Sequence, residues 1–279
     1  MREPVWPPVE PPAGALALHR ALAALPPPDG WWGLNPEPDP SALRVHLAEG
    51  RSIGDVWPPA LRPDAFFGLV RVMAAAAAPH FPGGDAEAVS ADLTRAETEM
   101  ARLAPEDMGR WVLRGECGLK GRAGFLVEHA RRAYLRAYAR TVTKRVPELE
   151  TGVLWSRRIC PVCGSLPGLG RIMKRQAGVP GPRLLICRRC ATNWRLPRFV
   201  CPFCPEEEPG DIVTVEGDAQ AELHVCKRCR RYLKVIREEM VDDPTLWDVQ
   251  TLYLDLLAEH MGFLPGAEPV DPAAPSPRH

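Results

Sequence analysis

Four cysteine pairs with the spacing C-x-x-C constrain the fold of this chain more than any other feature. The pairs begin at Cys160, Cys187, Cys201 and Cys226, and they hold eight of the nine cysteines. Two intervening residues let a tight turn aim both sulfurs at one point, where backbone N–H groups can donate to the thiolates. Two such turns make one tetrahedral four-sulfur site. Four turns therefore predict two metal sites.

The intervals between the pairs predict which turns share a metal. Twenty-three residues separate the first two pairs, twenty-one separate the last two, and ten lie between the second and third. Each long interval suits a small hairpin, and the short one suits a connection between two modules. We therefore expect one metal on Cys160, Cys163, Cys187 and Cys190, and another on Cys201, Cys204, Cys226 and Cys229. An interleaved arrangement, with the first pair joining the third and the second joining the fourth, is the alternative.

The donor set also restricts the chemistry of these sites. Four thiolates suit iron or zinc, and the sequence does not choose between the two ions. A closed four-sulfur site leaves no open position for a reacting water, so we predict no catalytic residues here. A disulfide framework would need an oxidising compartment. The N-terminal residues lack the charged head and apolar stretch of a secretory signal, which favours a cytoplasmic protein.

Composition excludes some classes of protein. Thirty-five basic and thirty-five acidic side chains give no net charge, which argues against a nucleic acid as the main partner. The longest unbroken apolar run, 72–78, is far shorter than the roughly 18 residues of a membrane span. The stretch 157–198 nevertheless holds ten basic residues and no acidic one. A zinc-ribbon protein that binds nucleic acid therefore stays as one alternative.

The sequence before the cysteine pairs predicts several helices. Apolar side chains recur at helical spacing from Val89 to Leu103 and from Phe125 to Val146, and shorter stripes occupy 15–25 and 66–78. Asp39 followed by Pro40 is typical of a helix start. No stretch in this half has the strand period, so it predicts an α-helical domain.

The second half of the sequence predicts short strands beside the cysteine pairs, followed by a helix. Strand-type runs occupy 183–186, 211–215, 223–225 and 232–236, and apolar residues from Leu246 to Leu257 have helical spacing. We predict an α+β fold: an α-helical N-terminal domain, two rubredoxin-like or zinc-ribbon modules and a C-terminal helix. The expected divisions are a proline-rich tail 1–12, the helical domain 13–150, the modules 151–199 and 200–240, the C-terminal helix 241–264 and a flexible tail 265–279.

Several of these segments resemble one known family. The runs 155–165, 184–198, 201–204 and 225–234, together with 241–243 leading to 254–256, resemble the formate dehydrogenase accessory protein family FdhE. The resemblance covers about 155–260, and over 1–150 it is only a helical domain of suitable length. It implies a cytoplasmic bacterial protein without enzymatic activity of its own. Such a protein binds the catalytic subunit of formate dehydrogenase during maturation, and the eight cysteines would be its metal ligands.

Two other functions stay open from the sequence. A rubredoxin-like electron carrier or redox sensor would use the same Cys-Pro-x-Cys turns, present at Cys160 and Cys201, with iron as the ion. The nucleic-acid-binding alternative would use the basic stretch 157–198. The single cysteine outside the pairs, Cys117, has no nearby histidine or second cysteine in the sequence, so we expect it to be inert.

Overall fold

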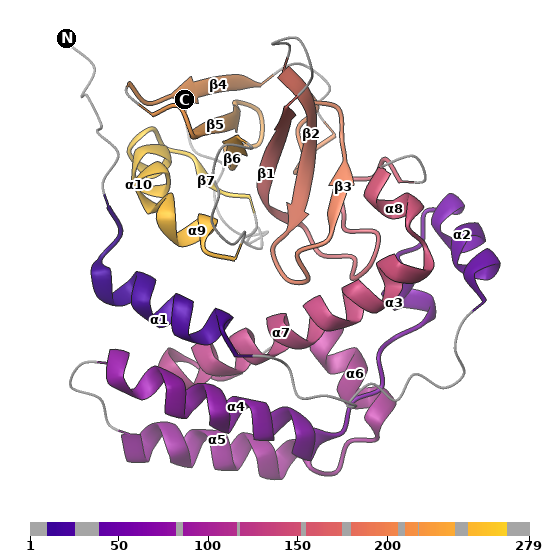
Figure 1. The fold of residues 1–279 in the computed structure, drawn as a ribbon, viewed down its shortest axis with the longest axis vertical. Coiled ribbons are helices and arrows are strands. Elements are labelled where there is room, and N and C mark those ends of the chain that lie inside the picture. The colour runs from indigo at the N-terminus through magenta and orange to yellow at the C-terminus, as the bar shows by residue number, and fades with distance from the viewer. Residues whose placement is uncertain are drawn as a thin grey trace.

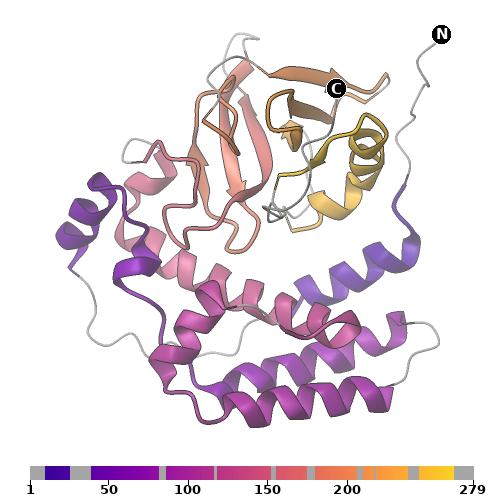
Figure 2. The same ribbon diagram turned by 180° about the vertical axis from the view of Figure 1, so that it is seen from behind.

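A helical N-terminal region carries a β-sheet in this chain, as Figures 1 and 2 show for the computed structural model. The structure describes residues 10–25, 39–81, 86–115, 118–151, 155–174, 180–205, 210–216, 218–237 and 245–266. The predicted α+β class is confirmed. Nearly all of the predicted tails 1–12 and 265–279, and Cys117, lie outside these residues.

The helices of the first half begin and end close to the predicted stripes. Asp39 caps α2 by accepting a hydrogen bond from Ser41 N at 3.1 Å, with Pro40 in the first turn. Between residues 10 and 151, the described segments contain no strand. Each helix within the described ranges is too short or too polar to span a bilayer. The elements are α1 (Ala13–Ala23), α2 (Pro40–Ala48), α3 (Ile53–Val56), α4 (Pro63–Ala77), η1 (Ala78–His80), α5 (Ala86–Met100), α6 (Pro105–Arg114), α7 (Gly121–Arg145) and α8 (Glu148–Thr151).

The long helix α7 forms the centre of the helical region. Its buried stripe includes Leu126, Ala130, Tyr134 and Tyr138, at spacings of four. Phe66 of α4 stacks on Tyr134 with ring centroids 5.4 Å apart. Helices α4, α5 and α6 all pack against α7, and the sheet lies on its other side in Figure 1. This helix therefore contributes both to the helical core and to the surface that carries the cysteine modules.

The two cysteine modules share one sheet. Its strand order is β3-β2-β1-β6-β5-β4, with β7 beside β6. Each module contributes an antiparallel hairpin and one further strand, and the modules meet where β1 pairs with β6 in parallel. The strands are β1 (Pro167–Lys174), β2 (Pro180–Cys187), β3 (Asn193–Arg195), β4 (Asp211–Thr214), β5 (Ala221–Cys226), β6 (Arg231–Arg237) and β7 (Leu264–Pro265).

Glycine makes the central pairing possible. Leu169 of β1 lies opposite Lys234 of β6, and Gly170 lies opposite Val235. A Cβ on Gly170 would meet side-chain atoms of Leu233 and Val235 at 3.1 Å, a distance closer than ordinary packing allows. The missing side chain therefore lets the branched side chains of β6 fill the space over β1.

The C-terminal helix predicted for 241–264 is divided in the structure. Its described parts are α9 (Trp247–Gln250) and α10 (Leu252–His260), which meet at the buried Thr251. The Thr251 hydroxyl donates to the Trp247 carbonyl at 2.7 Å, a local bond that competes with regular helix geometry. Helix α10 packs on β5 and β6 (Figure 1), and α9 contacts α1 of the helical region.

Candidate metal centres

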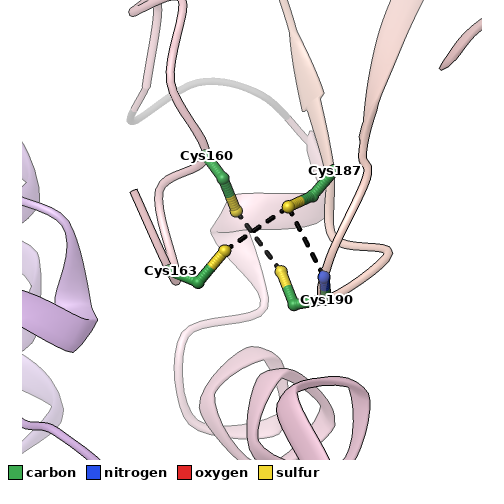
Figure 3. Close-up of side chains that lie close together, drawn as sticks. All are labelled: Cys160, Cys163, Cys187 and Cys190. Carbon is green, nitrogen blue, oxygen red and sulfur yellow. Dashed lines mark hydrogen bonds between the residues drawn. The ribbon is translucent and has the colours of Figure 1, made fainter. Parts of the chain in front are cut away.

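The first two cysteine pairs converge on one buried point. In Figure 3 the four sulfurs point toward one another, with Cys160 Sγ 3.4 Å from Cys190 Sγ and Cys163 Sγ 3.4 Å from Cys187 Sγ. All four sulfurs lie within 4.8 Å of one another. These separations are far longer than a disulfide bond, and none of the four residues is more than 3% exposed. We call this group the first cluster.

Tight turns aim these sulfurs inward. Gly164 donates to the Cys160 carbonyl at 3.0 Å with φ of 71°, a left-handed conformation that glycine adopts without strain. The second turn ends at Ala191, whose φ of 58° is uncommon for a residue with a side chain. Backbone N–H groups donate to the sulfurs: Val162 N to Cys160 at 3.4 Å, and Arg189 N to Cys187 at 3.4 Å. Such donors stabilise thiolates.

The first cluster is fastened to the helical region. Ile53 N donates to the Pro161 carbonyl at 2.8 Å, and Gly54 N donates to the Val162 carbonyl at 2.7 Å. These bonds place the first turn of α3 directly on the residues between Cys160 and Cys163. From the other side, the Arg189 guanidinium donates to the Leu113 and Val112 carbonyls at the end of α6. The four cysteines accordingly belong to the same buried core as the helices.

The last two pairs form a second cluster that is more accessible. Cys201 Sγ lies 3.8 Å from Cys229 Sγ, and Cys204 Sγ lies 3.8 Å from Cys226 Sγ. A tetrahedral site with metal–sulfur bonds of about 2.3 Å has sulfur–sulfur edges of about 3.8 Å. Cys201 and Cys226 are buried, but Cys204 and Cys229 are partly exposed. As in the first cluster, the residue after the last cysteine, Arg230, has positive φ, here 54°.

The thiols within each cluster perturb one another. Hydrogen bonds from the other three sulfurs hold the pKa of Cys163 well below its usual value, whereas burial raises the pKa of Cys160 and of Cys190. In the second cluster, a hydrogen bond with Cys229 lowers the pKa of Cys201 to about 5 and raises that of Cys229. Each cluster thus favours at least one thiolate, and a bound cation would displace the remaining protons.

Both clusters fit a tetrahedral metal ion. Each supplies four convergent sulfurs with N–H donors behind them, which is the donor set of zinc or iron. The eight cysteines pair as the sequence intervals predict, first with second and third with fourth, and the interleaved grouping does not occur among these residues. Neither cluster leaves a position for a reacting water, because four sulfurs complete a tetrahedron.

Many cations of the basic stretch 157–198 contact the protein itself. Arg158 donates to the Cys201 carbonyl at 2.9 Å, and Arg157 donates to the Glu49 carbonyl at 3.3 Å. Arg198 lies 3.3 Å from the buried carboxylate of Glu222. Much of the basic stretch therefore serves internal contacts and does not form a uniform surface for phosphates.

A buried polar network connects the two modules. Arg183 of β2 donates to the Pro197 carbonyl at 2.9 Å, to the Val200 carbonyl at 2.7 Å and to His224 Nδ1 at 3.2 Å. His224 Nε2 lies 2.7 Å from Glu222, so it is the protonated nitrogen that donates to this carboxylate. Burial lowers the pKa of His224 and favours this neutral form.

The sequence indicated the cysteine ligands but not the distant residues that hold their turns in place. The Ile53–Gly54 contact, the Arg189 bonds and the Arg183 network all join residues distant in the chain. Thr192 was likewise not singled out, although its hydroxyl lies 3.0 Å from Cys190 Sγ. A hydroxyl two residues after a ligand cysteine, and His224 two residues before Cys226, were local signals that could have indicated such residues.

Known proteins share the central segment and the fold. Residues 159–198 match the family model described as "FdhE, central domain". A protein named "Protein FdhE homolog" from Aquifex aeolicus is 35% identical over 115 residues, which are 39% of this chain and 40% of the relative. One of the same name from Shewanella oneidensis is 27% identical over 192 residues, 66% of this chain and 61% of the relative. The match to the Aquifex aeolicus relative thus covers less than half of that protein's length.

A solved structure supports the likeness over most of the chain. The crystal structure of the FdhE protein from Pseudomonas aeruginosa has a TM-score of 0.57 and 24% sequence identity to this chain. The match covers 90% of this chain and 84% of the crystallised one, and at this identity it shows the fold. The four-cysteine segment, the sequence relatives and the fold agree, and the predicted resemblance of this chain to the FdhE family is confirmed.

Proposed function

We propose that this chain is a non-catalytic accessory factor of formate dehydrogenase that acts in the cytoplasm and binds the catalytic subunit of that enzyme. The observation that carries the proposal is the pair of closed four-sulfur clusters within a fold similar to FdhE. Since four thiolates fill the coordination sphere of each ion, the metals would hold the molecule in one shape. A protein of this kind would work by binding, with the eight cysteines holding two ions of iron or zinc.

A deletion strain tests this proposal. Removing the gene from its native host should abolish or strongly reduce formate dehydrogenase activity, and the wild-type gene should restore it. The Cys163→Ser variant should fail to restore activity, whereas Arg140→Gln, an exposed change on α7, should restore it. Full formate dehydrogenase activity in the deletion strain would refute the accessory role. Separate purification of a tagged chain should recover the catalytic subunit, and its absence would count against the binding step alone.

An electron carrier or redox sensor is the second candidate, and one observation favours it. The second cluster has Cys204 and Cys229 partly exposed, so an ion there would lie within reach of a redox partner. Iron is required, because zinc has no accessible redox change. Protein purified without oxygen should then contain iron with a reversible absorbance change on reduction. Metal analysis that finds only zinc would eliminate this candidate.

A further inference from the structure

A cavity of about 120 Å³ lies where the helical region, the first module and α9 meet. Its walls include Leu22 of α1, Ala133 of α7, Leu169 of β1 and Val249 of α9. At about 30 Å³ for each water in the liquid, the volume suits about four water molecules, or one small polyatomic ion. The cavity borders the first cluster through Cys187, and none of the second cluster's cysteines lines it.

The charges around this cavity are mainly positive. Arg132 and Arg136 of α7 and Arg188, next to the first cluster, all line it. The carboxylate of Asp248 lies in the cavity wall, where it already forms an ion pair with Lys234 Nζ at 2.6 Å. Glu128 lies nearby, but it is shared among Arg131 at 3.0 Å, Arg132 at 3.8 Å and Arg189 at 3.9 Å. Among the described residues, cationic groups therefore outnumber the carboxylates that could balance them.

Arg132 is the residue that points most directly to a ligand. Its Nε is buried and has no hydrogen-bond partner among the described residues, because Glu128 is too far away at 3.8 Å. The Arg132 side chain as a whole is 36% exposed and lines the cavity. Arg136 and Arg188 take part in other interactions, which leaves Arg132 as the main candidate ligand.

The neighbouring titratable groups respond to this positive field. Burial, followed by the charge of Arg132, lowers the pKa of His129 to about 3 and also lowers that of His19. Both histidines are consequently neutral near pH 7, and the positive charge of the cavity comes from the guanidinium groups.

We propose that this cavity binds a small oxyanion, such as phosphate or a short carboxylate, with Arg132 as its principal ligand. A guanidinium group matches the paired oxygens of such an ion, and the apolar walls strengthen the attraction by lowering the local dielectric constant. The bound ion would contact α1, α7, the turn after β2 and α9 at once. It would therefore fasten the helical region to the first module and to the C-terminal helices.

Calorimetric titration of the full-length, metal-loaded protein tests this site. Inorganic phosphate, sulfate and acetate would be titrated separately at constant ionic strength, so that general screening stays the same. We expect saturable binding of phosphate, acetate or both to one site: acetate binding would indicate a carboxylate ligand, and phosphate without acetate a tetrahedral one. Arg132→Gln should weaken binding at least about tenfold, the equivalent of one lost charge-assisted hydrogen bond. The control Arg140→Gln removes the same charge from an exposed position two turns further along α7 and should leave binding unchanged.

A second variant keeps the test decisive if Arg132→Gln does not fold. Ala133→Leu adds volume to the cavity wall, keeps every charge, and should abolish binding. Metal content and far-ultraviolet circular dichroism would confirm that each variant is folded. The proposal would be overturned if none of the three ions binds saturably. It would also be overturned if Arg132→Gln and Arg140→Gln weaken binding equally, or if Ala133→Leu binds as well as the wild type does.

Discussion

Arg183 should control how firmly the second cluster holds its metal, although it belongs to the first module. Its side chain is only 2% exposed and donates to the carbonyls of Pro197 and Val200 and to His224. Val200 directly precedes Cys201, so these bonds fix the start of the second cluster. Replacing Arg183 with methionine keeps much of the side-chain length but removes all three donations.

The cost of Arg183→Met follows from the groups left behind. Two carbonyls and one imidazole nitrogen lose their donor at part-buried positions, so each costs about 1 kcal/mol, near the lower end of the 1–3 kcal/mol for a fully buried group. Methionine offsets part of this loss, because it refills apolar volume and no cation has to be buried. We expect the free energy of unfolding to fall by about 3 kcal/mol. Since Val200 adjoins Cys201, the second cluster should also release its metal faster.

Two measurements check this reasoning. Urea denaturation of the metal-loaded protein gives the change in stability, and transfer of metal to a coloured chelator gives the release rate of each cluster. Arg195→Met is the matched control, because Arg195 is exposed on β3 and makes no comparable set of bonds in the described structure. A loss below about 0.5 kcal/mol, within the usual range for surface changes, would refute the argument. Equal acceleration of both clusters would refute the link to Cys201.

Three other predictions concern the clusters and the buried network. Metal release to a chelator should occur in two phases, with the second cluster first, because Cys204 and Cys229 are partly exposed; a single phase would contradict this order. Cys163→Ser should lower the melting temperature of the helices, because they share a core with the first cluster, whereas Cys204→Ser should shift it by only a few degrees. Equal shifts of the melting temperature, followed by circular dichroism, would be inconsistent with that shared core. Burial opposes ionisation of Glu222, but hydrogen bonds with His224 and Arg237 outweigh it and lower the pKa of Glu222 from 4.5 to about 2. The ionised carboxylate stabilises the fold above pH 4.5, and this contribution is lost as the pH falls toward 2. The free energies of unfolding of wild type and Glu222→Gln should therefore differ by about 3 kcal/mol at pH 7, and this difference should narrow below pH 4.5. A difference that stays constant in urea denaturation across this range would argue against the lowered pKa.

The sequence was informative wherever a local pattern carried the structure. The apolar stripes around Leu93 and Tyr134 correspond to α5 and α7, and the four C-x-x-C pairs correspond to the two clusters. These features depend on residues a few positions apart, so their spacing is visible without any tertiary contact. Helix α6 was missed although Pro105 and the acidic first turn are typical of a helix start, because Gly109 in its middle weakens the helix signal.

The central strand of the sheet was also missed, for a physical reason. Strand β1 contains Gly168 and Gly170, which weaken a strand signal. The structure uses both glycines for close approach: a Cβ on Gly168 would lie 2.7 Å from Arg188 Cβ, and one on Gly170 would meet the side chains of β6. The need for glycine arises from neighbours that are distant in the chain, so the local pattern could not reveal it.

The parallel pairing of β1 with β6 has a consequence for how the chain is made. Residues of β1 and all four cysteines of the first cluster precede Arg231, where β6 begins. During synthesis the first cluster can therefore assemble while one side of β1 still has its N–H and C=O groups unpaired. Such an open edge attracts strands from other chains until its own partner arrives. Only once β6 has been made can the last strand of the second module cover this edge and protect the first module from such pairing.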